Sequence, residues 1–195
     1  MQALSRQTVI ADPPLARFLF ADTRFAVVWL LVRIYVGYAW LDAGWHKITD
    51  PTGGWVVTGD SLRKFWLQAT AIPALPARPS ITYDWYRAFL QFLLDNEAYT
   101  WFGKLIAFGE TAIGIALIVG AFVGIAAAAG AFMNLNFMLA GSASINPVLL
   151  ILAILLVLAW KTAGHYGADR FLLPLLGTPW RTPRAIPARR TPILA

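Results

Sequence analysis

Long apolar stretches dominate the pattern of hydrophobic and polar positions along the chain. Residues 111–160, between Glu110 and Lys161, contain no charged side chain, and a further apolar segment runs from Phe25 to Gly44. A helix that crosses a bilayer needs about 20 predominantly apolar residues. The uncharged stretch is therefore long enough for two crossings and the inner half of another, and the pattern predicts an integral membrane protein.

Turn-forming residues divide the apolar stretch into helices. Gly120 and Gly124 bracket a short turn, and residues 141–147 form a loop in which Asn146 caps a helix that Pro147 begins. The apolar segments are too long, and alternate too little, to be barrel strands. The predicted fold is an all-α, four-helix transmembrane bundle, with spans at residues 25–44, 101–120, 122–140 and 146–163.

Composition and charge agree with a membrane protein and predict its orientation. The chain is 58% hydrophobic and 13% charged, whereas soluble domains are about 25% charged. The head (residues 1–24) carries three arginines and the tail (165–195) is strongly basic, whereas the connection at 45–100 is balanced. Basic residues favour the cytoplasmic side. We expect a bacterial or archaeal cell membrane, both termini cytoplasmic, a tail that contacts lipid phosphates, and no nucleic-acid partner.

The outer connection contains two amphipathic segments that are too short to cross a bilayer. Residues 60–70 and 82–95 each place apolar side chains on one face of a helix, and helices of this kind lie in the membrane interface. The predicted apolar faces are Leu62, Phe65, Trp66 and Ala69 in the first segment, and Trp85, Phe89, Phe92 and Leu93 in the second. The layer either anchors the bundle or covers a site that opens outward.

Charged residues inside the predicted spans are the strongest candidates for a site. Arg33 and Glu110 each lie at the middle of a span, and a charge there costs about 2.5–3.5 kcal/mol, so we expect the two to pair. Asp42 and Lys104, nearer the outer side, form a second predicted pair. These pairs either fix the register of the helices or form a polar pocket for a quinone head group or a proton path.

Three further polar residues accompany these pairs. Asn134 shares a helix face with Gly130 and Phe137, about one turn outward of Glu110. It either joins two helices through hydrogen bonds or completes the pocket with Arg33 and Glu110. His46 and Lys47 directly follow the first predicted span and are expected to attract anions at the outer surface.

The sequence argues against several cofactors. There is no cysteine, which removes disulfides and thiolate-bound iron–sulfur clusters. His46 and His165 are predicted on opposite sides of the membrane, so we expect no haem or metal held by this chain alone. No dinucleotide or phosphate-binding fingerprint follows a strand. A quinone is the expected ligand, and any flavin or nicotinamide would come from a partner.

The order of these motifs over residues 24–180 resembles the DoxX/DoxD family of small four-helix membrane proteins. The motifs are Arg33, Gly37 and Gly44 with Trp45-His46-Lys47-Ile48; Phe108-Gly109-Glu110-Thr111-Ala112-Ile113-Gly114; Asn134; and the segments 167–174 and 176–180. The resemblance implies quinone-coupled sulfur metabolism, because DoxD-like chains form the membrane subunit of thiosulfate:quinone oxidoreductase. That enzyme also has a second, smaller component, so catalysis by this chain alone is not expected.

Three functions remain open from the sequence. The first is a quinone-interacting subunit that works with other membrane or periplasmic redox subunits. The second is a noncatalytic accessory subunit that stabilises a larger respiratory or photosynthetic complex. The third, a small-solute transporter, is least favoured because no inverted repeat or broken span is evident. The sequence leaves open whether the chain forms a homo-oligomer.

Overall fold

The computed structural model describes residues 12–177, and every regular element in that range is a helix. The elements, in chain order, are α1 (Pro14–Ala21), a 3-10 turn (Thr23–Phe25), α2 (Ala26–Ile48), α3 (Asp60–Thr70), α4 (Asp84–Asp95), α5 (Tyr99–Val119), α6 (Val123–Leu139), α7 (Asn146–Leu158), α8 (Trp160–Ala163) and α9 (Asp169–Leu175). Residues 1–11 of the predicted head and residues 178–195 of the predicted tail lie outside the described residues.

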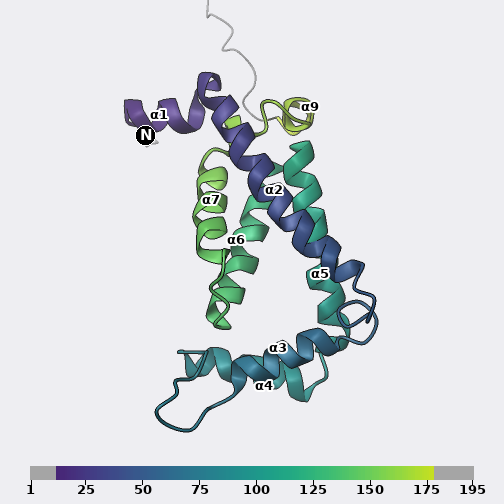
Figure 1. Cartoon of the computed structure of the whole chain (residues 1–195). Coiled ribbons are helices and arrows are strands. Elements are labelled where there is room, and N and C mark those ends of the chain that lie inside the picture. The colour runs from purple at the N-terminus through teal and green to yellow at the C-terminus, as the bar shows by residue number, and fades with distance from the viewer. Residues whose placement is uncertain (1–11, 178–195) are drawn as a thin grey trace, which may run out of the picture.

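Four longer helices form an elongated bundle (Figure 1). Among the described residues, α2 with the turn before it (Thr23–Ile48) and α5 are long and apolar enough to cross a membrane, while α6 and α7 are shorter apolar helices. The predicted all-helical fold is therefore confirmed, and each predicted span overlaps one of these helices. The first helix continues one turn past the predicted end at Gly44, to Ile48.

The fourth predicted span, 146–163, is interrupted. Helix α7 ends at Leu158, and the separate short helix α8 begins at Trp160. With 13 residues, α7 rises about 20 Å, less than the hydrocarbon core of a bilayer. Beyond the break, the Thr162 hydroxyl donates to the Phe20 carbonyl oxygen at 3.2 Å, which ties α8 to α1.

Helices α2 and α5 pack so closely that small residues are required between them. A Cβ atom on Gly114 would lie 2.5 Å from the backbone nitrogen of Leu41, and one on Gly44 would lie 2.6 Å from that of Thr111. These approaches fix the register of the pair, because neither helix can slide past a contact with backbone. Gly44 of α2 therefore lies level with Thr111 of α5.

The two helices predicted in the outer connection are present as α3 and α4, packed across one end of the bundle (Figure 1). Helix α3 buries Leu62, Trp66 and Ala69, as its periodicity predicts. The predicted buried face of α4 is wrong. Its buried residues are Tyr86, Leu90 and Leu94, whereas the aromatic side chains on the predicted face, Trp85, Phe89 and Phe92, are exposed.

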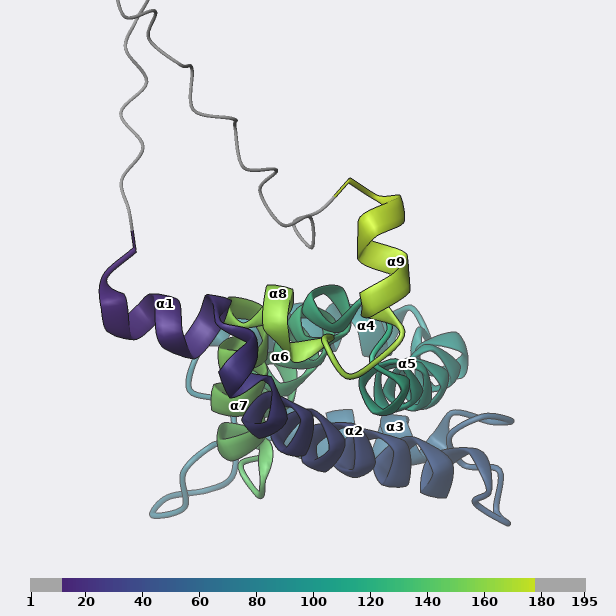
Figure 2. The same cartoon turned by 90° about the horizontal axis from the view of Figure 1, so that it is seen from above.

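The correction for α4 has a physical reason. Its apolar residues cover more than half of the helix circumference, so their pattern does not decide which part meets the bundle. Helix α4 therefore presents two apolar faces, one packed against protein and one open. The other end of the molecule carries α1, next to α8, together with α9 (Figure 2). We call these the α3/α4 end and the α9 end.

Candidate functional site

Glu110 forms an ion pair with Lys47 in which the carboxylate is buried and the ammonium group is partly buried. Glu110 lies in the middle of α5 with 1% of its side chain exposed, and the Lys47 Nζ atom donates to its Oε2 atom at 2.6 Å. Lys47 comes from the last turn of α2, the turn that the sequence did not predict to be helical. The predicted partner of Glu110, Arg33, is wrong.

Arg33 lies at the other end of the α2–α5 pair. Its Nη2 atom donates to the Tyr166 carbonyl oxygen at 3.0 Å, and its guanidinium lies against Gly120, the residue that ends α5. Ten residues of α5 separate Glu110 from Gly120, which is about 15 Å along the helix. The prediction failed because it equated depth with distance from the helix ends, whereas α2 and α5 are staggered.

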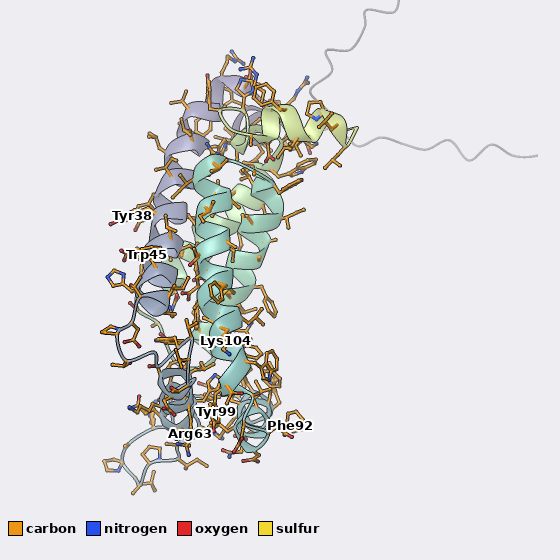
Figure 3. The ribbon with its side chains drawn as sticks, turned by 90° about the vertical axis from the view of Figure 1, so that its right-hand side faces the viewer. Tyr38, Trp45, Arg63, Phe92, Tyr99 and Lys104 are labelled. Carbon is orange, nitrogen blue, oxygen red and sulfur yellow. The ribbon has the colours of Figure 1, made fainter. Side chains whose placement is uncertain are left out.

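The second predicted pair, between Asp42 and Lys104, is also wrong. The Asp42 Oδ1 atom lies 3.5 Å from His46 Nδ1, and both of these side chains are more than half exposed. Lys104 lies on an exposed face of α5 (Figure 3), and none of the ion pairs in the described part of the chain includes it. The stagger of the two helices places Asp42 close to the level of Thr111 rather than that of Lys104.

Asn134 is fully buried in α6 but does not join the site. Within residues 12–177, neither polar atom of its side-chain amide has a hydrogen-bond partner, and the same is true of Trp40 Nε1. Of the three residues predicted to share one polar pocket, Arg33, Glu110 and Asn134, only Glu110 lines the cavity described next.

A cavity of about 320 Å³ contains the Lys47–Glu110 pair. We call it the central cavity. Its size is at the lower end of the range for ligand sites, about 300–1,000 Å³. Aromatic side chains form much of its wall, and polar groups of the loop between α6 and α7 complete it. The lining residues are Ala39, Trp40, Ala43, Lys47, Trp55, Phe65, Glu110, Phe137, Ser142, Ser144, Ile145, Asn146 and Leu149.

A second, more open cleft adjoins the central cavity. This outer cleft, of about 710 Å³, is lined by Asp42, Ala43, His46, Lys47, Thr49, Asp50, Pro51 and Trp55. Ala43, Lys47 and Trp55 line both spaces, and the Lys47 Nζ atom lies 5.0 Å from the centre of a Trp55 ring, a cation–π distance. The ammonium group therefore links a buried carboxylate to a cleft that opens to the surface.

Sequence reasoning missed Trp55, Ser142 and Asn146 as parts of a site. Trp55 lies in the loop before α3, and a Cβ atom on Gly103 would lie 2.5 Å from its carbonyl oxygen. Gly103 therefore gave a signal that a segment packs directly on α5, although it could not identify that segment. The prediction that Asn146 caps α7 is wrong, because α7 begins at Asn146 itself and Ile145 precedes it; the Asn146 side-chain amide donates to the Ser142 carbonyl oxygen at 2.8 Å.

The arrangement offers hydrogen-bond donors, an acceptor and aromatic walls for a small planar ligand. Among residues 12–177, no group of three or more His, Asp or Glu side chains is placed to hold a metal ion. His46 belongs to the α3/α4 end and His165 to the α9 end. No family model matches the chain, and comparisons with curated proteins and with solved structures found no match either.

Proposed function

We propose that this chain is the quinone-interacting membrane subunit of a redox complex similar to the DoxX/DoxD proteins, and that its central cavity binds the quinone head group. One observation carries the proposal: the Lys47–Glu110 ion pair lies in a cavity walled by aromatic side chains. A quinone head group is a planar ring with carbonyl oxygens, and it takes up electrons and protons on reduction. The cavity contains a matching stacking surface, a donor and a carboxylate.

Each residue of the pair has a separate role in this proposal. Lys47 Nζ donates a hydrogen bond to a head-group oxygen. An ammonium group has three donors, of which Glu110 occupies one and the Ala43 carbonyl oxygen, at 3.4 Å, a second, so the third is available to the ligand. The Glu110 carboxylate orients the ammonium group and exchanges a proton with it. The aromatic walls exclude water and strengthen both interactions. Protons reach the pair from the outer cleft, which Lys47 also lines.

The exposed surface supports a membrane setting with four crossings. Large apolar side chains are exposed on all four bundle helices, among them Leu31, Leu105, Ile125 and Ile151. Trp45, Trp85 and Trp101 are also exposed, and Figure 3 shows Trp45 pointing away from the bundle. Aromatic residues of this kind gather at the membrane interface. We propose that α3 and α4 lie in the outer interface and that both termini are cytoplasmic.

A partner must supply the electrons. The resemblance to the DoxX/DoxD family suggests thiosulfate or a related reductant as the donor, delivered through another membrane or periplasmic subunit. Purification of the chain from native membranes, followed by an assay of thiosulfate-dependent quinone reduction, tests this part of the proposal. Turnover by the copurified complex supports it. Copurification with a large complex that shows no such turnover would instead favour an accessory role.

Binding of the head group is tested with the purified chain in lipid nanodiscs. The probe is a dimethoxy-methyl-benzoquinone without a side chain, and the readout is quenching of tryptophan fluorescence, because Trp40 and Trp55 line the central cavity. We expect saturable quenching. The variant Glu110→Gln should weaken binding at least tenfold, about 1.4 kcal/mol, because a neutral amide orients the ammonium group less strongly.

The matched control is Glu97→Gln, which makes the same change at the turn before α5. Glu97 is exposed and lines neither the central cavity nor the outer cleft. This variant should bind the probe like the unaltered protein. Quenching that does not saturate, or equal affinity of the two variants, would refute a head-group site at Lys47 and Glu110.

A further inference from the structure

An apolar space adjoins the central cavity at two phenylalanine side chains that line both. This apolar cavity, of about 150 Å³, is bounded by α3, α4, α5 and α6. Its wall includes Leu62, Trp66, Leu90, Ile106, Met133 and Ala140. Phe65 of α3 and Phe137 of α6 line both this cavity and the central cavity, so the two spaces meet at these rings.

The apolar cavity offers a ligand almost no hydrogen bonds. The polar side chains in its wall are Tyr86 and Asn136, and they bond to each other: the Tyr86 hydroxyl donates to the Asn136 carbonyl oxygen at 3.0 Å and to its Oδ1 atom at 3.1 Å. Burial raises the pKa of Tyr86 to about 12, so this hydroxyl stays a neutral donor near pH 7. Cavities without free polar groups stay dry and accept apolar ligands.

The side of the apolar cavity away from the central cavity is open. Phe89 of α4 and Phe132 of α6 line it, and these side chains are 44% and 68% exposed. Both belong to the surface that we place in contact with lipid. Phe65 and Phe137 therefore separate the cavity of the Lys47–Glu110 pair from an apolar space that opens to the outside of the bundle, and movement of these two rings would join the two spaces.

We propose that the apolar cavity holds the first part of a hydrocarbon tail attached to the ligand of the central cavity. The ligand is then an amphiphile, a quinone head group with an isoprenoid chain that leaves the protein past Phe89 and Phe132. This inference rests on the proposed function of the central cavity. A dry cavity of about 150 Å³ holds a molecule the size of benzene, so the space matches about one isoprene unit.

The test compares two probes on the protein in nanodiscs: the tailless benzoquinone used above, and the same ring carrying one prenyl group. Affinity is measured by tryptophan quenching for the unaltered protein and for Ala140→Leu. Ala140 is buried in the wall of the apolar cavity and does not line the central cavity, so a leucine there occupies the space of the tail. The variant should bind the prenylated probe at least tenfold more weakly and the tailless probe unchanged.

The matched control is Ala129→Leu, the same substitution at an exposed position of α6 outside both cavities. It should leave both affinities unchanged, which separates loss of the tail site from a change in partition into lipid. Tailless binding with no loss of prenylated binding in Ala140→Leu would overturn the tail site and leave the head-group site intact. Absence of saturable binding by both probes would overturn the proposed function, and the tail site with it.

A second measurement uses the unaltered protein, in case Ala140→Leu does not fold. A quinone that carries a photoreactive diazirine at the end of its prenyl group should label the α4 and α6 segments that contain Phe89, Phe132 and Met133. Excess unlabelled prenylated quinone should suppress this labelling. Labelling confined to α2 or α7, or labelling that the competitor does not suppress, would contradict a tail in the apolar cavity.

Discussion

Arg33 and Glu110 are both 1% exposed and both lie at the interface of α2 and α5, yet their surroundings differ. Glu110 meets a flexible lysine side chain at the wall of a cavity. Arg33 meets backbone: its guanidinium donates to the Tyr166 carbonyl oxygen, and a Cβ atom on Gly167 would lie 2.6 Å from its Nη1 atom. Arg33 lines neither the central cavity, nor the outer cleft, nor the apolar cavity.

Asp169 completes the backbone contacts at the α9 end. Its carboxylate accepts the backbone N–H groups of Phe122 at 2.6 Å and Val123 at 2.9 Å, which start α6, and its own N–H donates to the Gly120 carbonyl oxygen. A negative charge at the start of a helix is stabilised by the helix dipole. The comparison teaches that a buried charge bonded to backbone holds segments together, whereas one bonded to a side chain beside a cavity is available to a ligand.

The largest effect is expected from removal of the carboxylate at the α9 end. Asp169→Ala leaves the buried N–H group of Val123 and the half-buried N–H group of Phe122 without an acceptor, so we expect the free energy of unfolding to fall by about 4 kcal/mol. Thermal unfolding in nanodiscs measures this change, with Asp84→Ala, an exposed position of α4, as the control. Equal stability of the two variants would contradict a structural role for Asp169. Any folded Asp169→Ala protein should still bind the tailless quinone.

Substitutions in the Lys47–Glu110 pair should affect both the stability of the protein and its binding of quinone. Glu110→Leu leaves the Lys47 ammonium group without its partner and should cost about 3 kcal/mol, since breaking a buried pair costs about 3–5 kcal/mol. The double variant Lys47→Met with Glu110→Leu should recover most of that loss, because apolar residues of similar size replace both charges. It should nevertheless bind no quinone. A stable double variant with full quinone affinity would make the pair a structural feature like Arg33.

The glycine contacts that set the register of α2 against α5 are tested by adding a methyl group. Gly114→Ala places a methyl group against the α2 backbone and should destabilise the protein by about 2 kcal/mol, as overpacking does. It should also weaken quinone binding, because α2 must shift to make room. Gly109→Ala is the control in the same helix, since a Cβ atom there meets nothing closer than Met133 Sδ at 3.9 Å. That change should stabilise the helix slightly. Loss of stability in the control alone would contradict the register described here.

The smallest expected effect is a pH dependence at the α9 end. Burial, reinforced by the charge of Arg170, lowers the pKa of His165 below its ordinary value of 6.5. As the pH falls below 6.5, the unfolded chain therefore takes up a proton before the folded chain does, and the folded state loses stability. The amide exchange rate of residues 164–175, relative to the intrinsic rate at each pH, should rise as the pH falls from 7 to 5. The variant His165→Gln should remove this rise. Faster exchange on raising the pH alone, after correction for intrinsic rates, would contradict the assignment.

Features that depend on residues close together in the sequence were predictable. The positions of α3, α5 and α6 follow from apolar periodicity and from the glycines that end the apolar runs. The continuation of α2 through Lys47 was not predictable by hydropathy, because the last turn contains His46 and Lys47, and polar residues of this kind are typical of an outer loop. The break after Leu158 was missed for the opposite reason, since no polar residue, glycine or proline marks it.

The sequence by itself determined that the chain is helical, that α2 and α5 are apolar enough to cross a membrane, and that Arg33 and Glu110 would be buried and need partners. The identity of those partners depends on the tertiary structure. Arg33 and Lys47, the predicted and the observed partner of Glu110, are 14 residues apart, which is about 21 Å along α2, so the register of α2 against α5 decides which of them meets Glu110. That register depends on the contacts of Gly44 and Gly114 with the opposite backbone. It cannot be obtained from the length of either helix, because staggered helices with the same sequences would bring different residues together.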